Sequence, residues 1–159
     1  MDSGADFRDR CLQLFGGDPV AYAENYFAAF TDYILKRKPD IVGHFDLITK
    51  YEESSPCGML CDPAYLQVAK KYITEAAKSG SIFEVNTGAI ARGLRTTPYP
   101  SEDLLYQLKK LDAKVILSSD SHSVQNLDCG FEQVRAQLRH IGFRHSYVLT
   151  GGEFVKVPL

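Results

Sequence analysis

Histidine, carboxylate and amide side chains follow three apolar segments of this sequence. They belong to Gly43-His44-Phe45-Asp46, Phe83-Glu84-Val85-Asn86 and Ser119-Asp120-Ser121-His122, each at the end of an apolar run. Such runs are typical of strands. In a barrel of alternating strands and helices, the carboxyl ends of the strands form one common surface. We therefore expect these side chains to converge, and imidazole and carboxylate groups together are ligands for a metal ion.

Asp120 and His122 are the sharpest of these signals. They stand two residues apart just after a buried apolar run, so a carboxylate oxygen and an imidazole nitrogen can reach the same cation. Zinc, manganese and iron all accept this ligand mixture, and the pair does not distinguish among them. The alternative is a turn in which Asp120 and Ser121 cap the following segment.

His44 follows Gly43 at the end of the first strand. An isolated strand histidine is more often a buried core residue than a ligand. Its position at the same strand end as Asp120 and His122 favours the ligand interpretation. Asp46 is expected either to orient His44 or to begin the turn.

Glu84 and Asn86 share one face of their strand, because side chains alternate. We expect this face to point toward the centre of the barrel. A carboxylate there is costly without a cation or hydrogen-bond donors. Glu84 is therefore expected to be a metal ligand, a partner of a ligand, or a clamp on a nearby arginine.

Arg92 and Arg95 lie on the glycine-containing loop that leaves the same strand. A guanidinium group matches the oxygen atoms of a phosphate, and the glycines allow the chain to approach an anion. Lys50, on the loop after His44, is a weaker candidate. The alternative is that the two arginines are solvated loop residues.

Helical and strand patterns alternate regularly and predict how these groups are positioned. Asp18-Pro19 begins the first clear helix, which Pro39 ends, and Asp62-Pro63 begins a second that Gly80 closes. Strands are predicted over 40–45, 81–86 and 114–119, with a loop over 87–100 and further helices beginning at Ser101 and near Asp128. The end of the chain predicts two strands joined by Gly151-Gly152. This order predicts an α/β fold with a mainly parallel sheet, covering helices and a C-terminal β-hairpin.

Composition is that of a globular protein. The chain has 159 residues, 45% hydrophobic and 24% charged, with a formal net charge of -2. We expect a single domain over residues 1–159. The charge gives no sign of nucleic-acid binding, and no signal peptide or apolar stretch of membrane-spanning length is evident. The prediction is a cytoplasmic protein without a membrane partner.

Four cysteines fit a reducing compartment. Cys57 and Cys61 are spaced as a C-x3-C pair, but a structural zinc site needs two further ligands and no second pair exists. An ordinary loop is the favoured interpretation of this pair.

The three polar segments together resemble the polymerase and histidinol phosphatase (PHP) family. The matching stretches are Asp40 to Leu47, Phe83 to Gly88 and Ser119 to His122. Two others, Thr96 to Ser101 and Val148 to Gly152, are similar to the histidinol-phosphatase branch. The resemblance implies a distorted (β/α)7, TIM-like barrel with a cluster of zinc, manganese or iron at the C-terminal mouth. It also implies hydrolysis of L-histidinol phosphate in histidine biosynthesis.

Residue roles follow from this resemblance. The residues that resemble metal ligands are His44, Asp120 and His122. Arg92, or else Arg95, resembles the arginine that binds the substrate phosphate. Glu84 resembles a residue that supports a metal ligand without itself binding the metal. His122 and Arg92 are the expected catalytic residues. The remaining expected site residues are Asn86 for substrate and Asp46 as a support.

The family's first His-x-His strand has no counterpart here, so the chain resembles only the C-terminal three-fifths of the barrel. We therefore expect an incomplete metal site, with at most three direct ligands, and little phosphatase activity. A partial barrel exposes a sheet edge, which a second copy, a missing N-terminal portion or a rearranged end is expected to cover. The alternative function is a non-catalytic interaction module derived from such an enzyme and stabilised by self-association. A PHP-type phosphoesterase acting on nucleotides or DNA is disfavoured by the acidic charge.

Overall fold

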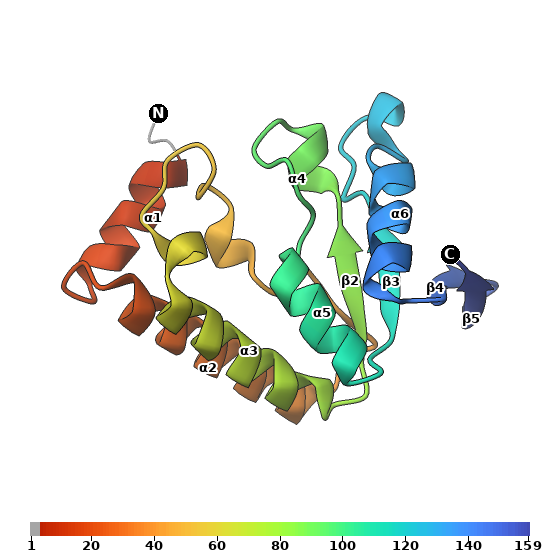
Figure 1. Ribbon diagram of the computed structural model, residues 1–159, viewed down its shortest axis with the longest axis horizontal. Helices are drawn as coiled ribbons and strands as arrows, with labels where there is room; N and C mark the ends of the chain where they lie inside the picture. The colour runs from red at the N-terminus through yellow and green to blue at the C-terminus, as the bar shows by residue number, and fades with distance from the viewer. Residues whose placement is uncertain (1–3) are drawn as a thin grey trace.

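The structure, a computed structural model, describes residues 4–159. Helices and strands alternate along this part of the chain (Figure 1). In order they are α1 Gly4–Gln13, α2 Pro19–Arg37, β1 Ile41–Val42, α3 Pro63–Ala77, β2 Ile82–Asn86, α4 Gly88–Ala91, α5 Glu102–Lys110, β3 Val115–Ser118, α6 Phe131–Ile141, β4 His145–Thr150 and β5 Glu153–Pro158. Three short 3-10 helices, at Leu47–Thr49, Met59–Cys61 and Val124–Asn126, lie in the connections.

The strands form one five-stranded sheet in the order β1-β2-β3-β4-β5. The first three pairings are parallel, and β4 and β5 form an antiparallel hairpin through Gly151 and Gly152. The predicted mainly parallel α/β sheet with a C-terminal hairpin is thus confirmed. Sequential parallel neighbours are also the pattern of a barrel wall, but β1 and β5 lie at the two edges here, and the partial TIM-like barrel stays a prediction.

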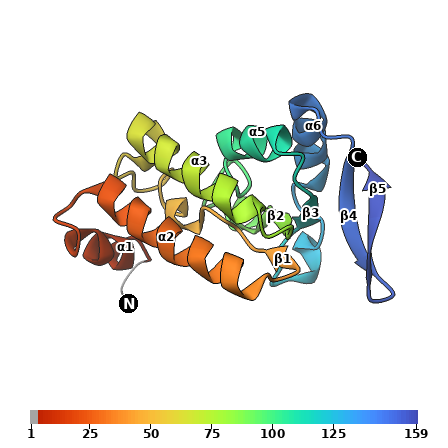
Figure 2. The same cartoon turned by 90° about the horizontal axis from the view of Figure 1, so that it is seen from below.

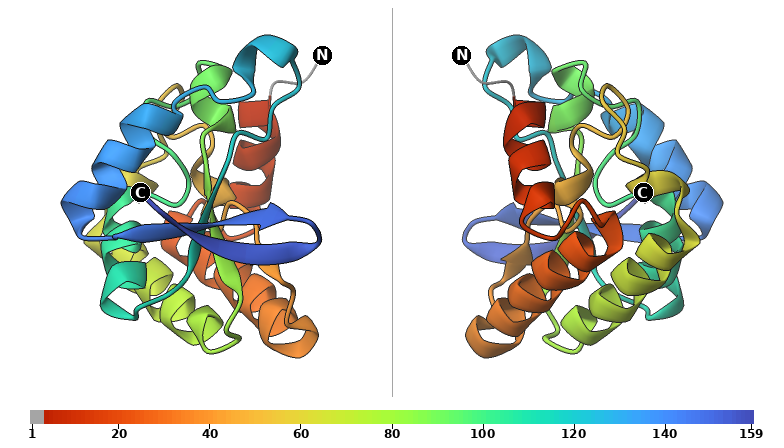
Figure 3. Two further views of the ribbon diagram at one scale, coloured as in Figure 1. Left: turned by 90° about the vertical axis from the view of Figure 1, so that its right-hand side faces the viewer. Right: turned by 90° about the vertical axis from the view of Figure 1, so that its left-hand side faces the viewer.

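The hairpin runs across the direction of β2 and β3 rather than alongside them (Figure 3). It contacts the parallel part of the sheet through a single register pair, Ile116 with Tyr147. The sheet therefore turns between β3 and β4 by much more than the ordinary twist between neighbouring strands.

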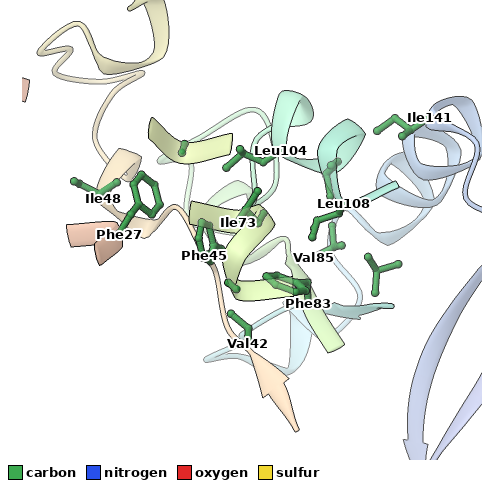
Figure 4. Close-up of a cluster of buried hydrophobic side chains, with 14 of the residues drawn as sticks. Phe27, Val42, Phe45, Ile48, Ile73, Phe83, Val85, Leu104, Leu108 and Ile141 are labelled. Carbon is green, nitrogen blue, oxygen red and sulfur yellow. The ribbon is translucent and has the colours of Figure 1, made fainter. Parts of the chain in front are cut away.

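Helices α3, α5 and α6 line one face of the sheet (Figure 2), and α2 packs alongside α3. Between them and the strands lies the hydrophobic core (Figure 4). Phe83 and Val85 of β2 point into this layer and are almost fully buried. Their neighbours Glu84 and Asn86 therefore face the opposite side of the sheet, because side chains alternate along a strand. The predicted alternation thus holds, and Glu84 and Asn86 lie on the same face of β2.

Aspartate caps fix the start of two helices, as predicted. The Asp18 carboxylate accepts hydrogen bonds from the backbone N–H groups of Val20 and Ala21, and Asp62 accepts one from Ala64. Each is followed by a proline at the first helical position, where no N–H is needed. Ser101 occupies the N-cap position of α5, as predicted, but its side chain makes no capping hydrogen bond.

Two helices correct the sequence prediction. Helix α1 precedes Asp18, where no clear helix was predicted, and α4 forms a single turn inside the segment that was predicted as a loop. Arg8 of α1 is held by distant groups, the Glu52 carboxylate and the Ser55 carbonyl. Contacts of this kind leave no local pattern in the sequence. Among the described residues, no helix is both long and apolar enough to cross a membrane.

Truncating a core leucine should strongly destabilise this fold. Leu108 of α5 is fully buried, so Leu108→Ala is expected to lower the free energy of unfolding by about 2–5 kcal/mol. Urea denaturation followed by circular dichroism measures the change. The matched control is Leu127→Ala, whose side chain is 61% exposed and whose loss should cost less than about 0.5 kcal/mol. Equal effects of the two substitutions would contradict the assigned core.

Candidate functional site

The polar side chains that follow the strands line one pocket of about 310 Å³. This pocket lies at the carboxyl end of the sheet, toward which the β2 arrow points in Figure 1. Five of the predicted site residues line it, together with three others. The predicted five are His44, Asn86, Arg92, Asp120 and His122, and the others are Leu47, Lys50 and Tyr99.

Glu84 holds His44 from beneath the pocket. One carboxylate oxygen, Oε2, accepts hydrogen bonds from the His44 backbone N–H at 2.8 Å and from the ring Nδ1 at 3.1 Å. Only 12% of the Glu84 side chain is exposed. Gly43 passes this carboxylate closely, because a Cβ there would lie 3.5 Å from Oε2. The two donors of His44 thus compensate a carboxylate that is largely removed from water.

The contact between His44 and Glu84 raises the pKa of the histidine and lowers that of the carboxyl group. The hydrogen bond to Glu84 raises the pKa of His44, although burial of the ring opposes the shift. Burial raises the pKa of Glu84, but the hydrogen bonds from the His44 side chain and backbone outweigh it, so the pKa is lowered overall. The proximity of Asp120 also raises the pKa of His44, so both carboxylates act on this ring.

Arg92 connects the two other ligand candidates. Its Nη1 donates to the Asp120 carbonyl at 3.2 Å and contacts His122 Nδ1 at 3.2 Å, and its Nη2 donates to Asp120 Oδ2 at 3.3 Å. A guanidinium group is always a donor, so Nδ1 of His122 must accept. This contact is a hydrogen bond only in the tautomer of His122 that carries its proton on Nε2.

Gly88 allows Arg92 to reach these groups. Helix α4 begins at Gly88, where a Cβ would lie 2.8 Å from the Ser119 carbonyl oxygen and 3.0 Å from both Arg92 Nη2 and the Asp120 Cβ. Any larger residue would separate the loop after β2 from the loop after β3. The single turn of α4 then places Arg92 over the second loop.

Two of the candidate ligands have left-handed backbone conformations. The φ angle is 21° at His44 and 44° at Asp120, a region that non-glycine residues adopt at an energetic cost. Surrounding contacts must hold both residues in place, and strain of this kind gathers at functional sites.

Asn86 forms the wall of the pocket at the end of β2. Its backbone exchanges two hydrogen bonds with Tyr99, at 2.8 and 3.0 Å, which brings the Tyr99 loop to the pocket. The side-chain Oδ1 accepts from the Gly88 N–H at 2.8 Å. The amide Nδ2 is buried and has no hydrogen-bond partner among the described residues. This nitrogen is not exposed to the pocket, and the Asn86 side chain also helps to lower the pKa of Glu84 on the same face of β2.

Arg95 and Asp46 lie outside the pocket in a buried polar layer. Arg95 donates to Thr49 Oγ1 at 2.6 Å and lies over the Tyr99 ring at 4.5 Å, while Asp46 accepts from the Ser101 N–H at 2.9 Å. Burial raises the pKa of Asp46. The Asp46 side chain is hydrogen-bonded to the segment before α5 rather than to His44. Asp46 directly precedes the 3-10 helix Leu47–Thr49, which agrees with the alternative prediction that it begins the turn.

The donor set fits a metal ion only in part. With Nδ1 bonded to Glu84, a neutral His44 keeps Nε2 free, which is the arrangement of metal-bound histidines supported by a carboxylate. The His122 tautomer is the opposite, since its Nε2 carries the proton while Arg92 occupies Nδ1. Within residues 4–159, no group of three or more His, Cys, Asp or Glu side chains is arranged to hold a metal ion. We therefore derive no chemical step through a metal.

Sequence reasoning identified most of the pocket but not all of it. It left the choice between Arg92 and Arg95 open, and only Arg92 lines the pocket. Leu47 and Tyr99 were not singled out, because a leucine and a tyrosine carry no specific signal in a loop. The Cys57 and Cys61 pair lies away from the pocket, and the Cys57 thiol donates to Glu52 Oε1 at 2.9 Å.

Fold and site together define an α/β protein with a polar pocket, lined by His44, Arg92, Asp120 and His122, at the carboxyl end of a mainly parallel sheet. The chain is similar to a probable histidinol-phosphatase of Schizosaccharomyces pombe, with 27% identity over 96% of this chain and 50% of that protein. It is also similar to a histidinol-phosphatase of Saccharomyces cerevisiae, with 27% identity over 78% of this chain and 43% of that protein. The chain thus spans about half the length of the curated relatives it matches. No family model matches it.

Removing the negative charge of Glu84 should lower the pKa of His44. Glu84→Gln keeps a hydrogen-bond acceptor but loses the charge that favours the imidazolium ion. Titration of the His44 ring resonance by NMR, without added metal, measures the pKa. Glu75→Gln, which removes an exposed carboxylate paired with Lys78, is the control and should leave the His44 titration unchanged. An unaltered His44 pKa in Glu84→Gln would contradict the assigned pair.

The same pair makes stability depend on pH in a defined direction. The raised pKa of His44 stabilises the fold below its ordinary value of 6.5, and this contribution is lost as the pH rises through the folded-state pKa. The lowered pKa of Glu84 stabilises above its ordinary value of 4.5 and is lost as the pH falls. The difference in unfolding free energy between the native chain and Glu84→Gln should therefore be greatest between these values and smaller at alkaline pH.

Proposed function

We propose that this chain carries the phosphate-binding part of a metal-dependent phosphomonoester hydrolase of the histidinol-phosphatase type, with L-histidinol phosphate as substrate. The observation that carries the proposal is the position of Arg92, which lines the same pocket as His44, Asp120 and His122. The similarity to two histidinol-phosphatases, together with the resemblance of the three polar segments to the PHP family, indicates the substrate class.

The pocket is suited to a phosphate group. Arg92 and Lys50 supply positive charge to it. A guanidinium group can direct two N–H groups at two phosphate oxygens. His44, with its raised pKa, adds a third positive group in mildly acidic solution. The negative charge on the phosphoryl oxygens would thus be compensated by Arg92, Lys50 and His44, which lie on different segments of the chain.

Phosphate binding would release the groups that Arg92 occupies. Once the guanidinium donates to phosphate oxygens, Nδ1 of His122 becomes available for a proton, and the imidazolium can protonate the leaving alkoxide. The Asp120 carboxylate is freed at the same time and can accept a hydrogen bond from the attacking water. In this proposal His122 and Arg92 are the catalytic residues, and Arg95 and Asp46 maintain the layer beneath them.

Metal dependence is part of the proposal. His44 through Nε2 and Asp120 would hold the ion, which we expect to be zinc, manganese or iron. His122 would be a third ligand only in the other tautomer and without its contact to Arg92, and it could not then also be the acid, because a protonated imidazole has no lone pair for a metal. Three protein ligands at most imply that the chain alone retains metal weakly.

A non-catalytic interaction module is the second candidate. The two edges of the sheet favour it, because β1 and β5 each pair on one side only and an unpaired strand edge can pair with another chain. Size-exclusion chromatography with metal analysis separates the candidates. A metal-free dimer would favour the module, and a particle that carries metal would favour the enzyme.

Loss of the Arg92 guanidinium should weaken phosphate binding. Arg92→Ala is expected to raise the dissociation constant for inorganic phosphate by tenfold or more, since charge-assisted hydrogen bonds of this kind are worth about 1.5–3 kcal/mol. Isothermal titration calorimetry measures it. Arg135→Ala removes an arginine of similar exposure that pairs with Glu132 on α6, and it should leave binding unchanged. Equal phosphate affinities of Arg92→Ala and Arg135→Ala would refute the proposed phosphate site.

Hydrolysis of L-histidinol phosphate tests the reaction itself. With added manganese or zinc, we expect the chain alone to release phosphate slowly, and His122→Ala to abolish that release. A colorimetric phosphate assay follows it, with Arg135→Ala as the control that should retain the native rate. Robust turnover by the chain alone would show that the three ligand candidates suffice, and a native rate in His122→Ala would refute the assigned role of this histidine.

A further inference from the structure

A basic pocket lies at the opposite end of the sheet from the pocket at Arg92. It has a volume of about 350 Å³, within the range of small-ligand sites. Its residues surround the starts of β3 and β4, and the connection from α5 to β3 lies at the lower end of the sheet in Figure 1. Asp120 and His122 follow β3 at its other end, so the two pockets are separate.

Four lysine or arginine side chains line this pocket together with a single carboxylate. The four are Lys109, Lys114, Arg144 and Lys156, the carboxylate is Asp112, and the His145 ring also lines the pocket. Lys109 lies in the last turn of α5, where a cation stabilises the helix through its dipole. The other three cations lie outside the helices, so helix stabilisation does not account for them. In a chain with a formal net charge of -2, they form a local excess of positive charge.

The four cations of this pocket have no acidic partner. Exposed lysines elsewhere form ion pairs, as Lys36 does with Asp32 on α2 and Lys71 of α3 with Glu24. Within residues 4–159, the side chains of the four pocket cations form neither a salt bridge nor a hydrogen bond. Like charges gathered in one pocket repel one another. A bound anion would remove this repulsion and supply the missing partners.

Two aromatic rings and one strand pairing position these charges. The Lys109 Nζ lies 5.6 Å from the centre of the Phe143 ring, and the Lys114 Nζ lies 5.8 Å from the centre of the Tyr147 ring. Tyr147 of β4 stands directly opposite Lys156 of β5, so their side chains lie on the same face of the hairpin. Lys114 and Lys156 are thus neighbours of one ring. A lysine above an aromatic ring keeps N–H groups free to donate to an anion.

We propose that the basic pocket lined by Lys109, Lys114, Arg144 and Lys156 binds a small anion that consists of two or three linked phosphoryl groups. Such a chain spreads negative charge over many oxygen atoms, which suits lysine ammonium groups that act as point charges from several segments. A strand of nucleic acid is disfavoured, because it requires basic groups along an extended surface, and these cations line one pocket. The phosphoryl chain is either free polyphosphate or part of a nucleotide. This inference does not depend on the proposed function.

Calorimetric titration with inorganic tripolyphosphate, at fixed ionic strength and without divalent metal, tests the inference. Lys114→Ala and Lys156→Ala should each raise the dissociation constant about tenfold, because each removes a charged donor, and Lys114→Arg should largely retain binding. Both lysines are exposed, so these variants are expected to fold. Lys36→Ala, at an exposed lysine of α2, is the matched control and should bind as the native chain does. Native affinity in Lys114→Ala, or no binding by the native chain, would overturn the inference.

NMR spectra separate this pocket from the pocket at Arg92. Tripolyphosphate should shift the amide resonances of Ala113, Lys114 and Tyr147, both in the native chain and in Arg92→Ala. Shifts confined to the loops that carry His44 and Asp120 would refute this inference and leave the proposed function standing. If these three resonances shift but inorganic phosphate does not bind at Arg92, the proposed function fails and this inference stands.

ATP and a single-stranded oligonucleotide distinguish the sources of the phosphoryl chain. Binding of ATP at least as tight as that of tripolyphosphate, with the same dependence on Lys114, would support recognition of a nucleotide. Binding of tripolyphosphate without binding of ATP would support free polyphosphate. An oligonucleotide that binds more tightly than tripolyphosphate and requires the same lysines would contradict the assignment of a small anion.

Discussion

The arrangement of the site depends on one carboxylate in the middle of the sheet. Glu84 occupies the side of β2 opposite the core, and little of its side chain meets water. A charged carboxylate in that position requires donors, and the backbone and ring of His44 supply two of them. The loop after β1 is therefore held to β2 by a side chain rather than by strand pairing, which covers only two residues.

Arg92 makes the second connection, between the loops after β2 and β3. Its guanidinium group lies against the Asp120 carboxylate and carbonyl and against the His122 ring. This geometry has a chemical consequence, because the positive charge stands between two groups that a metal ion would also use. An arginine and a dication repel each other, so both can act at these residues only if an anion draws the guanidinium away. Phosphate binding and metal binding would then be coupled, each favouring the other.

The sequence was sufficient for the framework of this site. Parallel strands share one edge at their carboxyl ends, so apolar runs that end in His44, Asn86 and Asp120 already place these residues near one another. Aspartate followed by proline marked the starts of α2 and α3 for a local reason, the capping of free N–H groups. By contrast, the helix that carries Arg8 depends on Glu52 and Ser55, more than forty positions away. Pairings at that separation leave no periodic pattern to detect.

The choice between Arg92 and Arg95 shows why the details of the site required coordinates. Both arginines follow β2, and both are able to bind phosphate. One turn of helix, permitted by the absence of a side chain at Gly88, turns Arg92 to the pocket. The chain then returns past Thr49 and Tyr99, which bind the Arg95 guanidinium and remove it from water. The buried Arg95 fixes the loop through these contacts. Arg92 lines the pocket, and the proposed function has it exchange its partners for a phosphate.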